Sequence, residues 1–340
     1  MGVTGETAKN IIHLCTSFVE IVDMAMGYPL KMSGAVSSQK VFYPIRKISE
    51  LTGINPVTLR AWERRYGLIK PERTPKGHRL YTDEHVQLIR RILGLIDQGI
   101  SIGQVKKILT DGKSPVDTES QTTLPAIDPW ETYRSRLLQA IARFDDAALD
   151  AGYNDCLSLY PLELVTRLLL LPLLHELHQR QARQPQSDPE LHFFRTYLRN
   201  KLGARFHHMT TQARGRRLLA ACLPGEFSEV ELLLFSLAAL TRGYRIVLLG
   251  PNMPLESLPL TLERSQCEAL VLFGSVEPPI ALLHTHLPAM SQKIQQPVFI
   301  GGSIAQSHAE VLRQAGLIPL VSDISSAVMQ VDDRLQFGST

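Results

Sequence analysis

The chain has 340 residues, of which 44% are hydrophobic and 20% are charged, enough sequence for about two or three domains with cores of their own. Its four cysteines lie far apart and form no Cys-x-x-Cys pair, which argues against a disulfide framework and against a zinc site. The net charge of +3 is small, but it is unevenly distributed along the sequence.

Residues 41–110 hold most of the positive charge. They contain thirteen Lys and Arg against six Asp and Glu, a net charge of +7. Because the first 40 residues are neutral in sum and the whole chain is +3, residues 111–340 carry −4. A basic segment joined to an acidic remainder is typical of a DNA-binding module attached to another domain, although a charge run alone often marks only a solvated surface.

The first 40 residues form an N-terminal extension. Its apolar stretch from Ile11 to Met26 is interrupted by charged residues, so it is too short and too charged to span a membrane. It also lacks the cationic start and the cleavage site of a signal peptide. We expect a cytoplasmic protein without membrane contact, whose first 31 residues are a dispensable leader ahead of a true start at Met32 rather than Met1.

Residues 43–68 carry the pattern of two short helices joined by a tight turn. Ile45, Ile48 and Leu51 recur every three residues and predict the first helix. Gly53 is expected to end this helix, because glycine adopts positive φ without strain.

The second helix has a strong start signal. Asn55 is a good N-cap residue, and Pro56 follows at the first helical position, where its missing N–H group costs nothing. The helix is expected to end at Gly67, with its apolar residues facing a core and its polar residues facing outward. The predicted core residues are Val57, Leu59, Trp62 and Tyr66, and the predicted outward residues are Thr58, Arg60, Arg64 and Arg65.

A cationic hairpin and two more helices are predicted next. Residues 68–81 are punctuated by Pro and Gly and contain several cationic side chains, as expected for a small β-hairpin that lies along a phosphate backbone. Thr82 is the expected N-cap of a helix that ends at Gly99, and Ser101 begins another helix through Leu109.

This order of elements resembles the MerR-type winged helix-turn-helix. The run Ile54–Leu68, followed by Gly77–Tyr81, is most similar to the branch that includes MlrA and the CarA, CarH and LitR regulators. The resemblance implies a homodimer that binds double-stranded promoter DNA at a pseudo-palindromic site, distorts the duplex and acts indirectly on RNA polymerase. It places the following residues at the DNA: Thr58, Arg60, Arg64, Arg65, Arg73, Lys76, His78, Arg79 and Tyr81.

The sequence after residue 110 changes character twice. Residues 111–129 lack an apolar pattern and are expected to form a linker, and residues 130–213 show the spacing of a small helical bundle. From 214 to 335, short apolar strands alternate with helices, which predicts a flavodoxin- or Rossmann-like parallel sheet covered on both faces. The expected fold class is therefore a multidomain α and α/β protein, with the winged helix-turn-helix at residues 41–110.

The bundle and the α/β domain together resemble the cobalamin-binding module of the CarA, CarH and LitR regulators. That module carries Glu-x-His after its first strand, and the His coordinates cobalt. Here the segment reads Glu226-Phe227-Ser228, and a serine hydroxyl is a poor substitute for imidazole. The module also presents a Trp and a Glu-His pair above the corrin, and alignment puts Leu177 and Leu191-His192 at those positions. The degenerate positions are thus Leu177, Leu191, His192 and Ser228.

We therefore expect that neither adenosylcobalamin nor any other cofactor is bound and that there is no metal site. Catalytic residues are not expected either. Gly301-Gly302-Ser303 has the form of a phosphate cradle, but a tight turn explains the same residues. Ser275, Glu277, Ser228 and Glu226 are expected near one sheet edge, without a His or Lys placed to activate a nucleophile.

The sequence predicts a transcriptional regulator, expected to be an activator, whose C-terminal module senses a signal or dimerises. By analogy with MlrA, its targets include biofilm and extracellular-matrix genes. Two alternatives remain open for the regulator: a live cobalamin sensor and a sensor of another small ligand, such as a nucleotide. A corrinoid-dependent enzyme or methyl carrier is the alternative from a different class.

Overall fold

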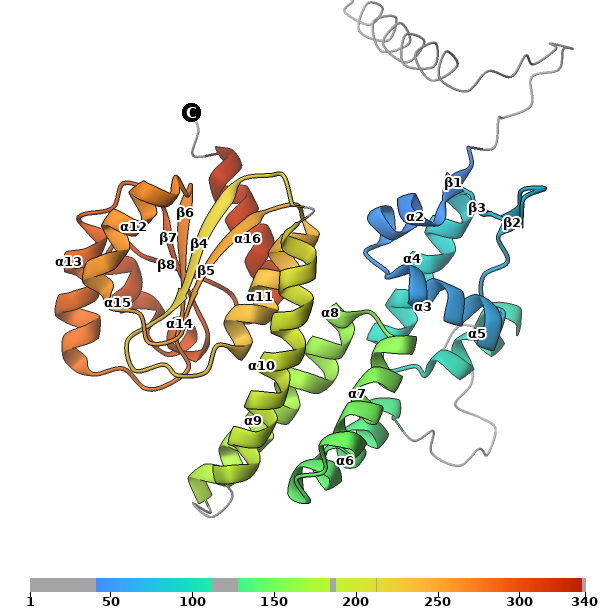
Figure 1. Ribbon diagram of the computed structural model, residues 1–340, viewed down its shortest axis with the longest axis horizontal. Helices are drawn as coiled ribbons and strands as arrows, with labels where there is room; N and C mark the ends of the chain where they lie inside the picture. Colours follow the sequence, from blue (N-terminus) through green and yellow to red (C-terminus); the bar gives the residue numbers. More distant parts are fainter. Residues whose placement is uncertain (1–40, 112–127, 184–187, 212, 338–340) are drawn as a thin grey trace, which may run out of the picture. The chain divides into compact units, whose positions relative to one another are not determined.

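The computed structural model describes residues 41–111, 128–183, 188–211 and 213–337 (Figure 1). The expected leader, and most of the expected linker at 111–129, lie outside the described residues. Within the described ranges, no helix is long and apolar enough to cross a membrane. The same residues contain no group of three or more His, Cys, Asp or Glu side chains that is arranged to hold a metal ion.

The first module contains helices and a small antiparallel sheet of order β1-β3-β2. Its elements are β1 (Tyr43–Pro44), α2 (Ile45–Thr52), α3 (Pro56–Ala61), the π-helical turn η1 (Trp62–Tyr66), β2 (Glu72–Arg73), β3 (Arg79–Tyr81), α4 (Asp83–Asp97) and α5 (Ile102–Asp111). The second predicted helix is therefore α3 continued by η1.

The predicted start and stop signals of these helices are confirmed. Gly53 closes α2 with φ 71°, and Gly67 closes η1 with φ 59°. The Asn55 side chain accepts a hydrogen bond of 2.8 Å from the backbone N–H of Val57. Thr82 caps α4 in a capping box, although its partner is a His rather than the usual Glu or Gln. Local chemistry therefore sets the helix boundaries here.

Among the described residues, six helical segments come next. They are α6 (Pro129–Ala142), α7 (Asp146–Leu159), α8 (Leu162–Val165), η3 (Thr166–Leu170), α9 (Leu171–Arg183) and α10 (Asp188–Thr210). The segments α8, η3 and α9 follow one another without a break. The π-helical turn η3 lies just before Pro172, whose missing N–H group removes an intrahelical hydrogen bond.

The last module is a parallel sheet of order β5-β4-β6-β7-β8, the order of flavodoxin-like folds, as the sequence predicted. Its strands are β4 (Arg217–Cys222), β5 (Arg245–Gly250), β6 (Ala269–Phe273), β7 (Val298–Gly301) and β8 (Ile318–Pro319). Its helical segments are α11 (Val230–Thr241), η5 (Leu255–Ser257), α12 (Leu258–Ser265), η6 (Leu282–His286), α13 (Leu287–Ser291), α14 (Ser303–Ser307), α15 (Ala309–Gln314) and α16 (Ile324–Phe337).

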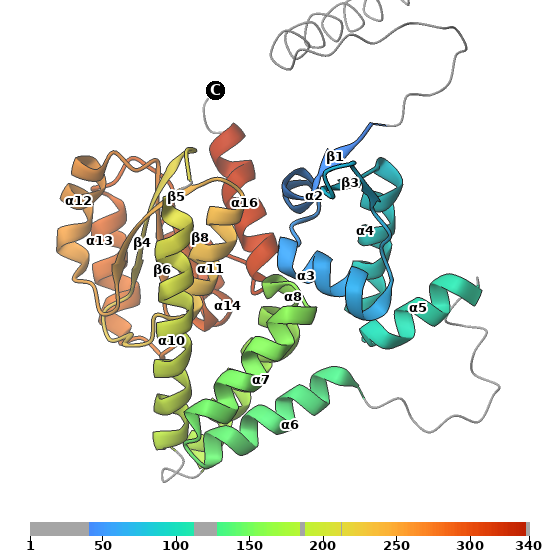
Figure 2. The same ribbon diagram turned by 45° about the vertical axis from the view of Figure 1, so that its right-hand side comes forward.

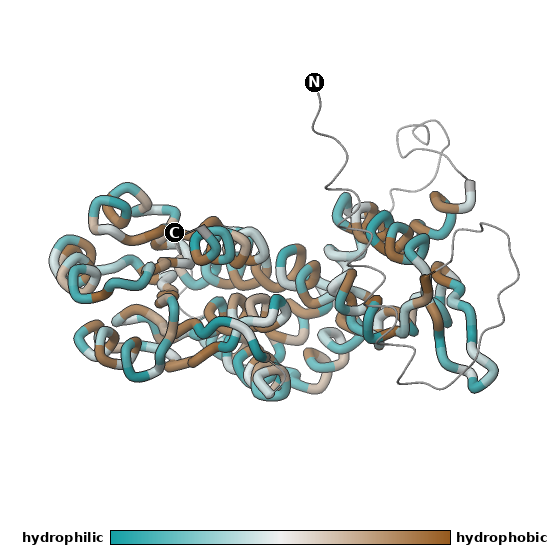
Figure 3. Tube along the Cα trace, turned by 90° about the horizontal axis from the view of Figure 1, so that it is seen from above, coloured by the Kyte–Doolittle hydropathy of each residue, from teal (hydrophilic) through white to brown (hydrophobic). Residues whose placement is uncertain are grey.

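Each face of this sheet packs against its own set of helices. One hydrophobic cluster joins the strands to α11 and α16, and another joins them to α12, α13 and α15. All five residues of β6 are buried, which explains why its sequence is apolar throughout. Along the helices, hydrophobic and hydrophilic positions alternate, as expected for elements with one face on a core (Figure 3).

Gly302, which follows β7, is required by its backbone conformation and by close packing. It has φ 85°, and a Cβ atom there would lie 2.4 Å from the carbonyl oxygen of Gly274. We expect Gly302→Ala to lower the free energy of unfolding by more than about 1 kcal/mol. Gly94→Ala, in the middle of α4 with no atom nearby, should instead be neutral or stabilising. Urea unfolding followed by circular dichroism measures both, and equal effects would contradict this account.

Candidate nucleic-acid interface and ligand module

Several predicted DNA-contacting cations lie on the surface. Arg60, Arg64 and Arg65 are exposed on α3 and η1, which together form the helix expected to read DNA and are called the recognition helix below. Lys76 and His78 are exposed at the tip of the hairpin between β2 and β3, the wing. The helix and the wing thus present positive charge to solvent from two elements, as binding to a polyanion requires.

The structure places two side chains differently from their predicted direction. Thr58, predicted to face outward, is only 1% exposed, whereas Val57, predicted to face a core, is 53% exposed. Tyr81, expected on or beside the wing, is also only 1% exposed. The Thr58 hydroxyl lies 3.5 Å from the carbonyl oxygen of Leu157 in α7, so a tertiary contact covers it. Tyr81 packs at the base of the wing, and its buried hydroxyl has no partner within the described part of the chain.

The wing is attached to the recognition helix by a residue that sequence reasoning missed. Glu63 accepts a hydrogen bond of 2.5 Å from Arg79 Nε and one of 2.8 Å from Arg73 Nη2. Both arginines were expected at the DNA, and in this structure both are paired with this carboxylate. The available signal was an acidic residue among the arginines of the second predicted helix. Glu63 therefore fixes the wing relative to the helix.

The ionisation of Glu63 follows from this geometry. Burial by itself raises the pKa of the carboxyl, but the hydrogen bonds and positive charges of Arg79 and Arg73 outweigh burial, so the pKa is lowered below its ordinary value. A carboxyl whose pKa is lower in the folded than in the unfolded chain stabilises the fold above the unfolded pKa. That contribution is lost as the pH falls through the folded pKa.

The polar loops at the carboxyl edge of the parallel sheet are connected by Glu226, which is only 4% exposed. Its Oε2 accepts hydrogen bonds from the backbone N–H groups of Ser275 (2.7 Å) and Val276 (3.2 Å), and its Oε1 accepts one of 2.9 Å from the N–H of Ser228. The expected approach of Glu226, Ser228 and Ser275 is thus confirmed. Glu277 lies apart from this group and accepts from His308 at 3.0 Å instead.

The glycines at this edge of the sheet do not enclose free space. A Cβ atom on Gly301 would lie 2.6 Å from Phe273 Cζ, and one on Gly274 would lie 2.8 Å from Leu223 Cδ1. Phe273 and Leu223 are themselves almost fully buried. In addition, α14 begins at Ser303 but has only five residues, too short to make a strong anion site. Gly301 and Gly302 therefore allow the close packing of this edge of the sheet.

Two of the degenerate positions named from the sequence, Leu177 and Leu191, lie in the hydrophobic core. Leu177 and Leu191 are 1% and 0% exposed and belong to the same buried cluster. His192 is on the surface, where its Nε2 lies 3.4 Å from Asp188 Oδ1.

Ion pairs and hydrogen bonds connect the bundle to the α/β domain. Arg199 Nε of α10 donates to Glu229 Oε1 at 2.5 Å, and the half-buried Arg195 attracts both Glu226 and Glu231. Burial raises the pKa of Glu231, whose Oε2 accepts from Ser275 Oγ at 2.9 Å. Charged side chains thus occupy the junction between α10 and α11.

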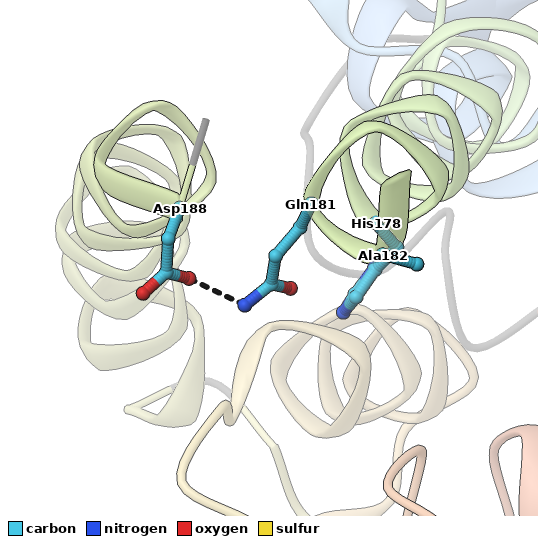
Figure 4. Close-up of a pocket in the computed structure, with 4 residues that line it drawn as sticks. All are labelled: His178, Gln181, Ala182 and Asp188. Atoms are coloured by element: carbon cyan, nitrogen blue, oxygen red, sulfur yellow. Dashed lines mark hydrogen bonds between the residues drawn. The ribbon is translucent and has the colours of Figure 1, made fainter. Parts of the chain in front are cut away.

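An open hollow of about 490 Å³ lies beside the ends of α9 and α10 (Figure 4). It is lined by His178, Gln181, Ala182 and Asp188, and the Gln181 amide donates to Asp188 across it. Burial, together with the charge of nearby Arg195, lowers the pKa of His178. The lining residues come from the bundle and include none from the sheet edge.

Comparison with known families identifies the first module. Residues 43–111 match the MerR HTH family of regulatory proteins. These residues form a MerR-type helix-turn-helix domain. The winged arrangement, the cationic helix and the cationic wing described above are thus the DNA-binding part of this family's architecture.

Two curated relatives extend the similarity beyond this domain. The HTH-type transcriptional repressor CarH of Myxococcus xanthus is 28% identical over 277 residues, 79% of this chain and 91% of CarH. The HTH-type transcriptional regulator MlrA of Escherichia coli is 36% identical over 143 residues, 42% of this chain and 54% of MlrA. Both relatives are named as HTH-type transcriptional regulators or repressors.

The monomethylamine corrinoid protein of Methanosarcina barkeri has a similar fold, with a TM-score of 0.50 and 13% sequence identity. The similarity covers 60% of this chain and 98% of that protein. At this identity the comparison concerns the fold alone. At the corresponding edge of the sheet in this chain, the Glu226 carboxylate accepts hydrogen bonds from the backbone of the neighbouring loops. Phe273 and Leu223 fill the space beside the glycines.

Glu63→Gln tests the attachment of the wing. We expect it to lower the free energy of unfolding at pH 7 by about 1 kcal/mol, because the charge that binds Arg79 and Arg73 is lost. The difference should shrink as the pH falls through the lowered pKa of the folded wild-type carboxyl, because that carboxyl then also becomes protonated. The control is Glu50→Gln, which affects only exposed pairs on α2 and should cost less than about 0.5 kcal/mol. Urea unfolding at several pH values would contradict the account if both variants lost stability equally.

Proposed function

We propose that this protein is a sequence-specific DNA-binding transcriptional regulator that acts as a homodimer in the cytoplasm. The observation that carries the proposal is the exposed cationic surface on a capped recognition helix and a wing, within a MerR-type domain of net charge +7. Its homologues CarH and MlrA are named as transcriptional regulators, which supports promoter DNA as the partner. Two-fold symmetry of a dimer would match a pseudo-palindromic operator, and RNA polymerase would respond to the altered promoter.

We further propose that the C-terminal module has lost cobalamin binding and has no enzymatic activity. The proposal is supported by Ser228, which stands where the cobalamin-binding module has its cobalt-coordinating His, and by Leu177 and Leu191, which are buried where that module has its Trp and Glu. It is also supported by the Glu226 carboxylate, which accepts hydrogen bonds from the neighbouring loops. A corrinoid-dependent enzyme or methyl carrier would need the missing imidazole and has no use for a winged helix. The module then serves assembly or the recognition of a different signal.

The first experiment is selection of genomic DNA fragments by the purified full-length protein, with sequencing of the retained pool. We expect a palindromic motif, equally enriched with and without adenosylcobalamin, and by analogy with MlrA some motifs should lie upstream of biofilm or matrix genes. Transcription in vitro from an enriched promoter reads whether the protein activates, as expected, or represses. A retained pool without any shared motif would reject sequence-specific binding.

Arg64→Ala and Arg65→Ala test the recognition helix. Each should weaken operator binding by about tenfold and reduce the slope of log K against log salt by about 1 for a phosphate contact. Arg143→Ala, an exposed arginine at the end of α6, is the matched control and should leave both quantities unchanged. Fluorescence anisotropy at several salt concentrations makes the measurement. Unchanged binding by both recognition-helix variants would place the DNA elsewhere.

Cobalamin binding is tested by gel filtration after incubation with adenosylcobalamin in the dark. We expect no stoichiometric corrinoid absorbance with the wild-type protein. Ser228→His should not create it, because Phe273 and Leu223 still fill the space beside the sheet. The Methanosarcina barkeri corrinoid protein is the positive control. A cobalamin spectrum that co-elutes with the wild-type chain at one equivalent would disprove the proposed loss.

A further inference from the structure

One face of the recognition helix is covered by the helical bundle of the same chain. Thr58, Ala61 and Trp62 lie on that face at helical spacing, and they are 1%, 5% and 0% exposed. The indole Nε1–H of Trp62 donates a hydrogen bond of 2.7 Å to the carbonyl oxygen of Leu159, the last residue of α7. The Thr58 hydroxyl lies 3.5 Å from the carbonyl oxygen of Leu157 in the same helix.

Other contacts connect the DNA-binding domain to the bundle. Arg167 in η3 forms an ion pair with Asp97 at the end of α4. Tyr160, which follows α7, lies near the backbone of Ile102 in α5. Within the bundle, its ring packs against that of Trp130 at a tilt of 48°, with ring centroids 4.6 Å apart. The buried residues of the DNA-binding domain and of the bundle belong to one continuous hydrophobic cluster. Both views show α3 beside the segment where α7 ends and α8 begins (Figures 1 and 2).

A recognition helix cannot bind the bundle and the major groove with the same face. The groove is about 12 Å wide, and an α-helix with its side chains is about 10–12 Å across, so no room is left for a second helix. The N-terminal turns of the helix contact the base edges in helix-turn-helix complexes, and Thr58 and Ala61 belong to these turns. In the structure, α7 covers this part of the helix.

We propose that the segment from Leu157 to Tyr160 masks the recognition helix, and that specific DNA binding requires the helix to separate from it. This inference rests on the proposed function. Arg60, Arg64 and Arg65 remain exposed in the masked form, so the domain keeps its electrostatic attraction to DNA. Masking therefore reduces sequence-specific DNA binding more than it reduces the nonspecific attraction of the domain to DNA.

The effect of masking on affinity follows from a two-state equilibrium. The apparent dissociation constant equals the intrinsic constant divided by the fraction of molecules in the open form. A substitution that weakens the contact between the domain and the bundle increases that fraction and tightens specific binding. It does so without adding any contact to the DNA.

Arg167→Glu provides the test, because it places a second negative charge beside Asp97. Both side chains are partly exposed, so the fold should tolerate the change, and circular dichroism checks this. We expect the dissociation constant for the selected operator to fall about two- to fivefold. The added negative charge would by itself weaken DNA binding. Tighter binding would therefore indicate that the recognition helix separates more readily from the bundle. The charge swap Asp97→Arg with Arg167→Glu should restore the wild-type constant.

Two further measurements make the result specific. Arg143→Glu changes the charge by the same amount at an exposed site on α6 and should not tighten binding. Hydroxyl-radical footprinting should show more oxidation in residues 157–160 when operator DNA is bound to the wild-type protein. Circular dichroism of each variant also verifies that its helical content is unchanged.

The outcomes separate this inference from the proposed function. If the wild-type protein binds its operator but Arg167→Glu binds no more tightly, or if the charge swap fails to reverse a gain, masking is disproved. Footprinting that is identical with and without operator DNA disproves it as well. If none of the proteins binds any double-stranded DNA, the proposed function itself is wrong, and the masking inference is overturned with it.

Discussion

Packing of the recognition helix on two sides is the constraint on which much of this structure depends. Trp62 is fully buried and donates its indole N–H to the end of α7, whereas Glu63, the next residue, accepts from two arginines of the wing. Because neighbouring residues on a helix point about 100° apart, one short segment contacts both the bundle and the wing. A shift of this helix would disturb both contacts together.

The π-helical turn η1 lies at the same place. It spans Trp62–Tyr66 and ends at Gly67, whose positive φ closes the helix. π-Helical turns are often found at functional sites, because they redirect side chains relative to a regular α-helix. Here the turn includes Glu63, Arg64 and Arg65, the residues that connect the wing to the helix and present charge to solvent.

The α/β module contrasts with this cationic surface. A buried carboxylate, Glu226, takes the backbone donors of the loops at the carboxyl edge of the sheet, where parallel α/β folds usually bind ligands. Arg199 and Glu229 close the junction with the bundle. Internal side chains thus satisfy polar backbone groups of the loops at this edge of the sheet.

The sequence by itself determined the elements whose signals are local. The caps at Asn55 and Thr82, the stop at Gly53 and the apolar strands follow from short-range chemistry and periodicity, and so the MerR-type domain and the parallel sheet were predictable. Only the tertiary structure decided which polar side chains are exposed and unpaired, and therefore open to a partner. Thr58 is covered by a helix about 100 residues further along the chain. Glu63 accepts hydrogen bonds from arginines of the wing. Such partners depend on long-range packing, which no local pattern encodes.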